Sequence, residues 1–421
     1  MATTPAPQIE TPPPARGPLA PGGPLVSLRH RDFRFLLGSN MALQIGSWVQ
    51  TIGMGWLVLH DLHGDATDLG LVALLRGASM LLLSPIGGHL AGKLERRRQL
   101  MIYTAVTASI STVLAVLITT GHISLWIIFI TATIGGIAEA LAGPLRMLLV
   151  YDAVGGSDLT NAVALNSLAG NAMRVIGPAL GGVLIGTVGT QGAFQLQAVA
   201  LVLCIILTSR LRPSHPEEIQ SGEGILRSLF EGLRYVGRDK RMLVIVIMAV
   251  IPSVLIYPYV TYLPVFATEV LHSNETGYGY LAAAVGLGAL LGGTVVAYTT
   301  AGSRMGQKMV WSCLCYCLMV GAFTLSRNLW LSVGLLATAG IFFSVYSALN
   351  MSMMQLLAKR EYRSRIMSLQ TMTGGITPFS SLLMGRMIDA WGAPSVVGAW
   401  VALGALCALL VGIFSQELRQ A

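Results

Sequence analysis

Residues 87–99 read GGHLAGKLERRRQ and separate two long apolar stretches of the chain. This short break holds one acid, Glu95, and four basic residues, which are Lys93, Arg96, Arg97 and Arg98. Breaks between apolar helices that carry Lys and Arg stay on the cytoplasmic side when a protein inserts into a membrane. The stretch therefore predicts an inner-face anchor between two membrane-spanning helices.

The composition of the whole chain supports a membrane location. Of its 421 residues, 54% are hydrophobic and 11% are charged, and the mean hydropathy is +0.68, whereas a soluble chain has about 25% charged residues. A helix of about 20 apolar residues can cross a bilayer. Twelve such windows recur, at 33–60, 69–92, 100–119, 122–144, 162–187, 192–209, 242–267, 277–300, 309–325, 329–354, 367–388 and 393–415. The expected fold is an all-α integral membrane protein with twelve transmembrane helices.

The net charge of +8 at pH 7 comes from 27 basic residues that are distributed unevenly across the expected membrane. If the N-terminus is cytoplasmic, 23 of them fall in inner segments and only Arg327 falls in an outer break. Because basic residues are retained in the cytosol, this distribution predicts that both termini are cytoplasmic. It also argues against nucleic acid as a partner and for the lipid bilayer.

The windows form two groups of six around the longest interior break. Residues 1–30 are rich in Pro and predict a disordered cytoplasmic tail. We expect an N-terminal six-helix bundle over 31–209, a C-terminal bundle over 242–415, and a cytoplasmic tail at 416–421. The break at 210–241 spaces apolar residues among arginines. It predicts a cytoplasmic linker with an amphipathic helix on the inner membrane surface or, alternatively, a partly ordered soluble linker.

The two halves show a weak internal similarity. Pro178 precedes Gly192 by the same spacing as Pro378 precedes Gly392, and each pair begins in the fifth window of its half. Repeated six-helix halves are common among secondary transporters, whose substrate site lies between the halves near the bilayer midplane. We therefore expect two pseudo-symmetric bundles around a central site.

The stretch at 87–99 resembles the loop signature of the major facilitator superfamily. That signature has a Gly, an Asp four residues later, then a basic residue and a basic pair. The matching residues are Gly88, Lys93, Arg96 and Arg97. Gly92 stands where the family has its Asp, and Glu95 is the nearby acid. The resemblance implies a gating motif that clasps the cytoplasmic gate, with Glu95 as a substitute partner in a different geometry.

A second stretch, NAMRVIGPALGGVL at 171–184, combines a proline with small residues that leave one helix side nearly bare. It resembles the fifth-helix motif of exporters and antiporters in the same superfamily. Its key residues are Arg174, Gly177, Pro178, Gly181 and Gly182. A purely structural packing role is the alternative to a part in transport direction.

Together with residues 33–60 and 360–369, these stretches resemble the branch of the superfamily that contains the enterobactin exporter and macrolide efflux proteins. The resemblance runs over about residues 32–414. It implies a monomeric secondary transporter of a bacterial cytoplasmic membrane. The implied activity is proton-coupled export of an amphipathic small molecule, such as a siderophore or a macrolide, by alternating access. Uptake, or transport of a lipid-type molecule, stays open.

Other function classes lack their motifs. No stretch matches the complete phosphate-binding GxxxxGK[ST] loop, so ATP is not an expected partner. No HExxH occurs, and a polytopic membrane enzyme or a receptor is the less favoured reading. The five cysteines all fall inside apolar windows, where they are interpreted as small hydrophobic residues. No cofactor or metal is expected.

Charged residues inside the windows are candidates for function, because a charge at the bilayer centre is costly. Glu139 is the only acid well inside a window and is the candidate proton carrier. Burial disfavours its charged form and a nearby arginine favours it, so movement between those environments can couple protons to transport. Arg174 or Arg146 is the expected partner. A static ion pair is the alternative.

The resemblance to the major facilitator superfamily implies that the first and seventh windows line the substrate cavity. Arg76 is predicted either to receive an anionic group of the substrate or to reach outward to the membrane surface. Aromatic and amide side chains suited to an amphipathic ligand are Gln44, Trp48, Gln50, Tyr257, Tyr259 and Tyr262. Three prolines spaced by six residues predict a bendable seventh helix, and they are Pro252, Pro258 and Pro264.

Overall fold

The computed structural model describes residues 23–91, 95–213, 234, 236–237, 239–299, 304–357 and 363–415. Within these ranges the chain is helical apart from short connections, and no strand occurs in them. Most of the expected linker at 210–241, most of the N-terminal tail and the last six residues fall outside these ranges.

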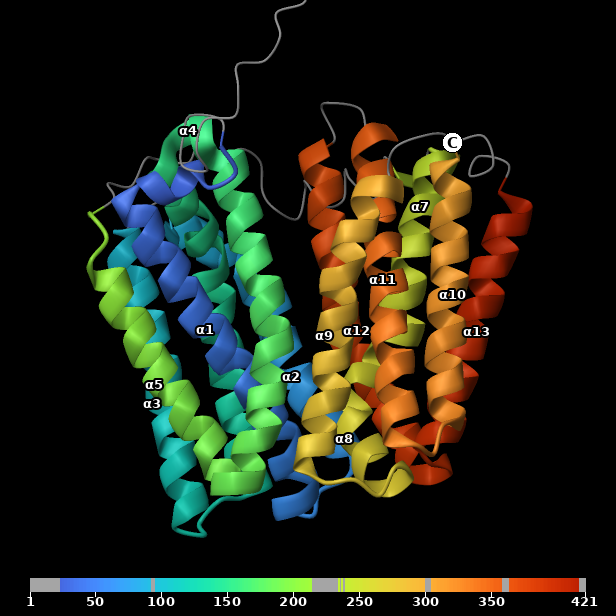
Figure 1. Ribbon diagram of the computed structural model, residues 1–421, viewed down its shortest axis with the longest axis horizontal. Helices are drawn as coiled ribbons and strands as arrows, with labels where there is room; N and C mark the ends of the chain where they lie inside the picture. The colour runs from blue at the N-terminus through green and yellow to red at the C-terminus, as the bar shows by residue number, and fades with distance from the viewer. Residues whose placement is uncertain are drawn as a thin grey trace, which may run out of the picture.

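The helices form two groups in space (Figure 1). The first group contains η1 (Val26–Arg29), α1 (Arg31–Trp56), η2 (Leu57–Asp61), α2 (Ala66–Ala91), α3 (Arg96–Thr119), α4 (Leu125–Val188) and α5 (Thr190–Ser209). The second contains α7 (Lys240–Ile251), η3 (Pro252–Ile256), η4 (Tyr257–Tyr262), α8 (Leu263–Val265), η5 (Phe266–Val270), α9 (Glu275–Thr299), α10 (Met305–Leu325), α11 (Leu329–Leu357), α12 (Arg363–Trp391) and α13 (Ala393–Phe414). Helix α1 begins, and helix α13 ends, at the same end of the molecule. We call this the terminal end, and the opposite one the distal end.

Helix α4 differs from the two separate windows expected at 122–144 and 162–187. The residues between those windows are helical, and the chain changes direction only at Gly155, whose φ is 69° and ψ is −175°. Glycine adopts this conformation readily because it has no Cβ, so one residue reverses the helix path. Figure 1 shows the two arms of α4 descending from the bend.

The chain is a multi-pass membrane protein. Among the described residues, nine helices are long and apolar enough to cross a membrane, and α4 is counted once among them. α1 has 26 residues and α12 has 29, but both contain more polar side chains and are not among the nine. The number of twelve transmembrane helices therefore stays a prediction.

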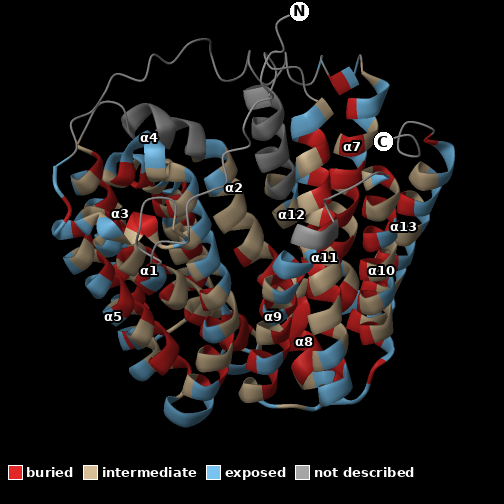
Figure 2. Ribbon diagram, turned by 45° about the horizontal axis from the view of Figure 1, so that its top comes forward, coloured by how far each residue is buried: buried red, intermediate tan, exposed pale blue. Residues whose placement is uncertain are grey.

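Apolar side chains cover the outward-facing sides of both groups, where Figure 2 shows many exposed residues. Val199 in α5 is 65% exposed, Leu318 in α10 64% and Leu403 in α13 50%. In a soluble protein such exposure would be unfavourable, but lipid tails are as apolar as leucine. The outer surface is thus suited to hydrocarbon.

The expected interruption of the seventh window is confirmed. After α7 the backbone passes through a π-helical turn from Pro252, a 3-10 segment from Tyr257, the short α8, and a second π-helical turn that ends at Val270. Proline removes a backbone donor and clashes with the preceding turn, which explains why a regular helix ends at each point.

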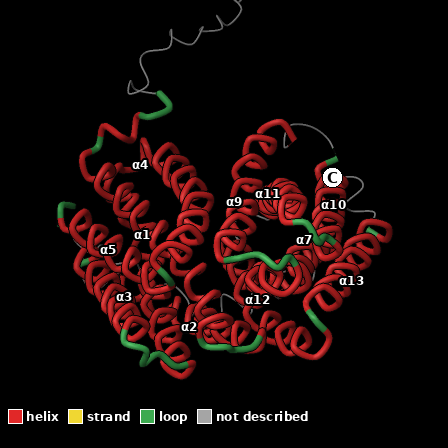
Figure 3. Tube along the Cα trace, turned by 60° about the horizontal axis from the view of Figure 1, so that its bottom comes forward, coloured by secondary structure: helices red, strands yellow, loops and turns green. Residues whose placement is uncertain are grey.

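The two helix groups meet along α2 with α12 and along the second arm of α4 with α9 (Figure 3). Backbones approach closely here: a Cβ on Gly182 would lie 2.9 Å from the Cα of Gly279, and one on Gly279 would lie 2.9 Å from the Cα of Gly182. Small residues permit such approach between membrane helices. The contact between the groups therefore depends on the absence of side chains.

We predict that Gly182→Ala destabilises the protein, because the added methyl group overpacks the contact with α9. Overpacking costs about 1–3 kcal/mol, which should lower the unfolding temperature of the purified protein by several degrees. Gly334→Ala in α11 is the control, since a Cβ there meets nothing within 4 Å. Equal unfolding temperatures for the two variants would contradict the prediction.

Candidate functional site

A polar cavity lies inside the first helix group, between α1, α2, α3, the first arm of α4 and α5. Its volume is about 80 Å³, several times the roughly 10–15 Å³ that one water molecule needs. Its polar lining includes Gln44, Gln50, Arg76, Glu139 and Arg146. We call it the inner cavity. Five of the seven substrate or proton residues expected in this half thus line one cavity, and the other two, Trp48 and Arg174, do not.

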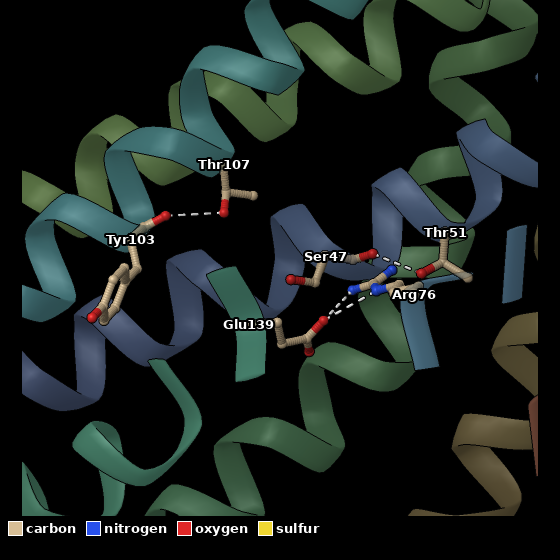
Figure 4. A network of polar contacts seen from close by, with 6 residues as sticks. All are labelled: Ser47, Thr51, Arg76, Tyr103, Thr107 and Glu139. Carbon is tan, nitrogen blue, oxygen red and sulfur yellow. Dashed lines mark hydrogen bonds and ion pairs between the residues drawn. The ribbon is translucent and has the colours of Figure 1, made fainter. Parts of the chain in front are cut away.

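Arg76 and Glu139 form an ion pair across this cavity. The Nε and Nη2 atoms of Arg76 donate to one carboxylate oxygen of Glu139 at 3.0 and 2.8 Å. Figure 4 shows the two side chains pointing toward each other, with Ser47 of α1 close by. Their side chains are 37% and 38% exposed, so the pair faces the cavity rather than a dry core.

This pairing corrects the expected one. Sequence reasoning gave Glu139 either Arg174 or Arg146 as its partner, and Arg76 a separate role toward substrate or the membrane surface. The correct partner is on α2, 63 residues earlier in the chain. Spacing along the sequence does not reveal which faces of α2 and α4 meet, so only the packing of the helices identified it.

Arg146 lines the inner cavity two helical turns after Glu139, and it also lines a second cavity. This second cavity, which we call the side cavity, has a volume of about 230 Å³ and lies between α1 and the two arms of α4. Asn40 donates from Nδ2 to the Oδ1 of Asn166 at 2.9 Å across it. Gln44 is shared by the two cavities, as Arg146 is.

A third cavity, the central cavity, lies between the two helix groups. Arg174, Trp48, Tyr257 and Phe343 are among its lining residues. The guanidinium carbon of Arg174 lies 5.3 Å from the centre of a Trp48 ring, which is a cation–π contact. Arg174 and Trp48 therefore face the space where a central substrate site was expected, and Arg174 does not bind Glu139.

The three tyrosines of the seventh window separate into two environments. Tyr257 lines the central cavity and its ring lies 5.4 Å from that of Phe343. Tyr259 and Tyr262 are 1% and 0% exposed. The hydroxyl of Tyr262 donates to the carbonyl oxygen of Ser381 in α12. Tyr259 and Tyr262 were expected to line the substrate cavity, but both pack inside the protein.

The expected gating motif is only partly described. The backbone of Gly88 lies in α2, while Gly92 and Lys93 fall outside the described residues. Arg97 and Arg98 bind Glu95 at 3.2 and 2.6 Å. Glu95 therefore holds basic residues of its own segment.

Arg96 has a partner that sequence reasoning missed. It is 4% exposed and its Nη1 donates to both carboxylate oxygens of Asp152 in α4, at 2.8 and 2.9 Å. Arg97 also donates to the carbonyl oxygen of Leu211, at 2.8 Å. These contacts connect the start of α3 with α4 and with the end of α5 inside one helix group.

The glycines of the fifth-helix motif pack against two different helices. A Cβ on Gly177 would lie 2.4 Å from the Cβ of Trp48, and one on Gly181 would lie 3.1 Å from the Cβ of Ile52, both in α1. Gly182 instead faces α9 in the other group. The packing role that was left open for this motif is therefore present in the structure.

A contact between the two groups at the distal end was also missed. Asp389 of α12 accepts hydrogen bonds from the backbone N–H groups of Ala66 and Thr67, each at 2.9 Å. It thereby caps the N-terminus of α2, while Arg386, one turn earlier in α12, is exposed. An acid at the C-terminal end of a helix opposes the helix dipole. This unfavourable position is a feature of the sequence that could have predicted a hydrogen-bond partner for Asp389 outside its own helix.

Comparisons with known proteins agree with this architecture. Residues 22–420 match the model of a family described as transmembrane secretion effector, which is a major facilitator family. The chain is 26% identical to the staphyloferrin A transporter of Staphylococcus aureus, over 85% of this chain and 90% of that protein. It is 24% identical to the multidrug efflux pump Tap of Mycolicibacterium fortuitum, over 89% and 93%. It is 26% identical to the enterobactin exporter EntS of Shigella flexneri, over 84% and 85%.

Solved structures share the fold at low sequence identity. A bacterial homolog to the human lysosomal transporter Spinster, in an inward-facing and unoccupied conformation, has a TM-score of 0.73 and 13% identity, covering 93% of this chain and 99% of that one. A POT family transporter has a TM-score of 0.74 and 12% identity, covering 92% and 96%.

The family model spans nearly the whole chain, and the cavities lie within and between two groups of apolar helices. Small molecules are the substrates that transporters of this superfamily bind within the membrane. The protein belongs to the transmembrane secretion effector family of the major facilitator superfamily, and it is a membrane transporter rather than an enzyme.

Proposed function

We propose that this protein is a proton-coupled exporter of an amphipathic small molecule. The observation that carries the proposal is the Arg76–Glu139 pair, which faces a cavity large enough for water inside a membrane-spanning bundle. The names of the relatives, a multidrug efflux pump and an enterobactin exporter, support export. ATP has no part in the proposed cycle.

The ion pair supplies a physical means of coupling. While Glu139 is ionised, the charged hydrogen bonds from Arg76 hold α2 against α4. A proton that reaches the carboxylate through the cavity removes that attraction and frees the guanidinium. Arg146 lines the same cavity, and its positive charge also favours the ionised carboxylate, which aids release of the proton.

We further propose that the terminal end faces the cytosol of a bacterial cell and that the protein resides in the inner membrane as a monomer. The arginines that begin α3 lie at this end. Trp126, Trp330 and Trp391 lie at helix termini of the distal end and are 76%, 68% and 65% exposed. Tryptophans of this kind mark the membrane–water interface. The distal end is then the outer one.

The structure corresponds, in this proposal, to the inward-facing state of alternating access. At the distal end Asp389 caps α2 and Gly182 contacts Gly279. These two contacts hold the two groups together on the outer side. The similar fold of an inward-facing Spinster homolog agrees with this assignment. Export requires these contacts to separate.

We predict that Glu139→Gln abolishes proton-driven efflux, because the amide is isosteric but cannot take up or release a proton. The measurement is efflux from proteoliposomes with an imposed pH gradient, after a panel of siderophores, macrolides and dyes has identified a transported compound. The variant's rate should fall to that of wild-type protein treated with an uncoupler.

Asp61→Asn is the control for this experiment. Asp61 is an exposed carboxylate that contacts His60 at the distal end, outside all three cavities. Its efflux should equal that of the wild type. Undiminished gradient-driven efflux by Glu139→Gln would eliminate Glu139 as the proton carrier and leave the ion pair as a static brace.

A second prediction concerns the cap at the distal end. Asp389→Ala removes the acceptor of two backbone N–H groups, and loss of a helix N-cap costs about 0.5–2 kcal/mol. The equilibrium should therefore shift by about 2- to 30-fold toward the outward-facing state. The readout is labelling of a cysteine introduced at Leu382, beside α2, by a membrane-impermeant thiol reagent added from outside.

Arg386→Ala provides the matched control, since Arg386 is exposed on the same helix one turn earlier. We expect labelling at the wild-type rate in that variant and faster labelling in Asp389→Ala. Slower or unchanged labelling in Asp389→Ala would show that the cap does not hold the outer side closed.

A further inference from the structure

The charges inside the first helix group do not balance. The side chains that line the inner and side cavities include two arginines, Arg76 and Arg146, and one acid, Glu139. Arg76 and Glu139 neutralise each other through hydrogen bonds of 3.0 and 2.8 Å. One positive charge, that of Arg146, is left over in a membrane-spanning region.

Arg146 has no ion pair and no hydrogen bond within the part of the chain that the structure describes. The nearby acids along α4 are already engaged, Asp152 by Arg96 and Asp158 by His30. A lone arginine inside the membrane carries a penalty of about 2.5–3.5 kcal/mol on insertion scales, so such residues usually face a partner or a pathway. The partner of Arg146 is therefore absent from its own helix bundle.

Uncharged hydrogen-bond donors stand beside this arginine in the side cavity. Asn166 accepts from Asn40 with its oxygen at 2.9 Å, which leaves its own amide group free to donate. Gln44 lines the cavity from α1 and makes no hydrogen bond in the described ranges. A guanidinium with amide donors around it matches an anion with several acceptor oxygens, and a carboxylate fits the planar fork of arginine.

The size of this space sets what part of a ligand it can hold. The side cavity measures about 230 Å³, less than the roughly 300–1,000 Å³ of sites that enclose a whole drug-sized molecule. It adjoins the inner cavity through Gln44 and Arg146, which line both. It has room for the anionic end of a molecule whose apolar part lies outside it.

We propose that Arg146, together with the amides of Gln44 and Asn166, binds a carboxylate of the transported molecule, so that the substrate of this exporter is an amphipathic anion. The inference rests on the proposed export function and narrows its substrate class. Binding of the anion supplies the negative charge that the bundle lacks. Glu139 then remains available for protonation, because the substrate carboxylate binds Arg146 and the proton binds Glu139.

The test uses two dyes that share one uncharged fluorophore, a BODIPY dye with a pentanoic acid chain and its methyl ester, which lacks the carboxylate charge. Their binding to purified protein in detergent is measured by fluorescence anisotropy. We expect the free acid to bind at least about ten-fold more tightly to the wild type, as a charge-assisted hydrogen bond implies. Arg146→Gln should remove this preference, and Arg146→Lys should restore part of it.

Arg386→Gln, an exposed arginine outside the cavities, should keep the full preference. Equal affinity of the two dyes for the wild type, no binding of either, or a preference that survives in Arg146→Gln would overturn the proposal. Displacement of both dyes alike by chloride would also overturn it, because a simple anion would then fill the site.

Efflux of the free-acid dye from proteoliposomes separates the two proposals. Carboxylate preference at Arg146 together with gradient-driven efflux is the expected result. Gradient-driven efflux without that preference overturns only the anion site. A preference for the carboxylate without any gradient-driven efflux of either dye overturns the proposed export function instead.

Discussion

The close approach of the two helix groups at the distal end is the constraint on which the rest of the structure depends. Gly182 and Gly279 bring α4 and α9 into backbone contact, and Asp389 fixes the start of α2 to the end of α12. These contacts use small residues and backbone donors, so they need little side-chain ordering. Because they lie between the two groups and not within either one, the groups can in principle separate there without unfolding either bundle.

The polar chemistry is concentrated in the first helix group. The ion pair of Arg76 with Glu139 and the unpaired Arg146 lie within it, and Arg174 faces the central cavity from it. The second group contributes aromatic surface, such as Tyr257 and Phe343, to the central cavity. In the proposed cycle, one bundle holds the charges that respond to protons and substrate, while the other supplies an apolar wall against which it moves.

The sequence located most of the relevant residues but not their partners. Glu139 was recognised because an acid inside an apolar window is costly, and Gly182 because small residues allow helices to pack. The partner of Glu139 and the cap made by Asp389 depend on residues 63 and 322–323 positions away. The break expected between residues 144 and 162 contains the turn at Gly155, but its helical flanks were not predicted.

Sequence alone thus determined that this is an α-helical membrane protein and which end of it is basic. It also identified the charged side chains whose burial in the bilayer costs enough free energy to indicate a function. These properties follow from composition and local spacing, since the bilayer acts on each segment separately. Tertiary structure decided which arginine neutralises Glu139, which arginine is left without an anion, and which tyrosines reach a cavity. These outcomes depend on how helices rotate and approach one another, and that is set by packing between segments distant in the chain.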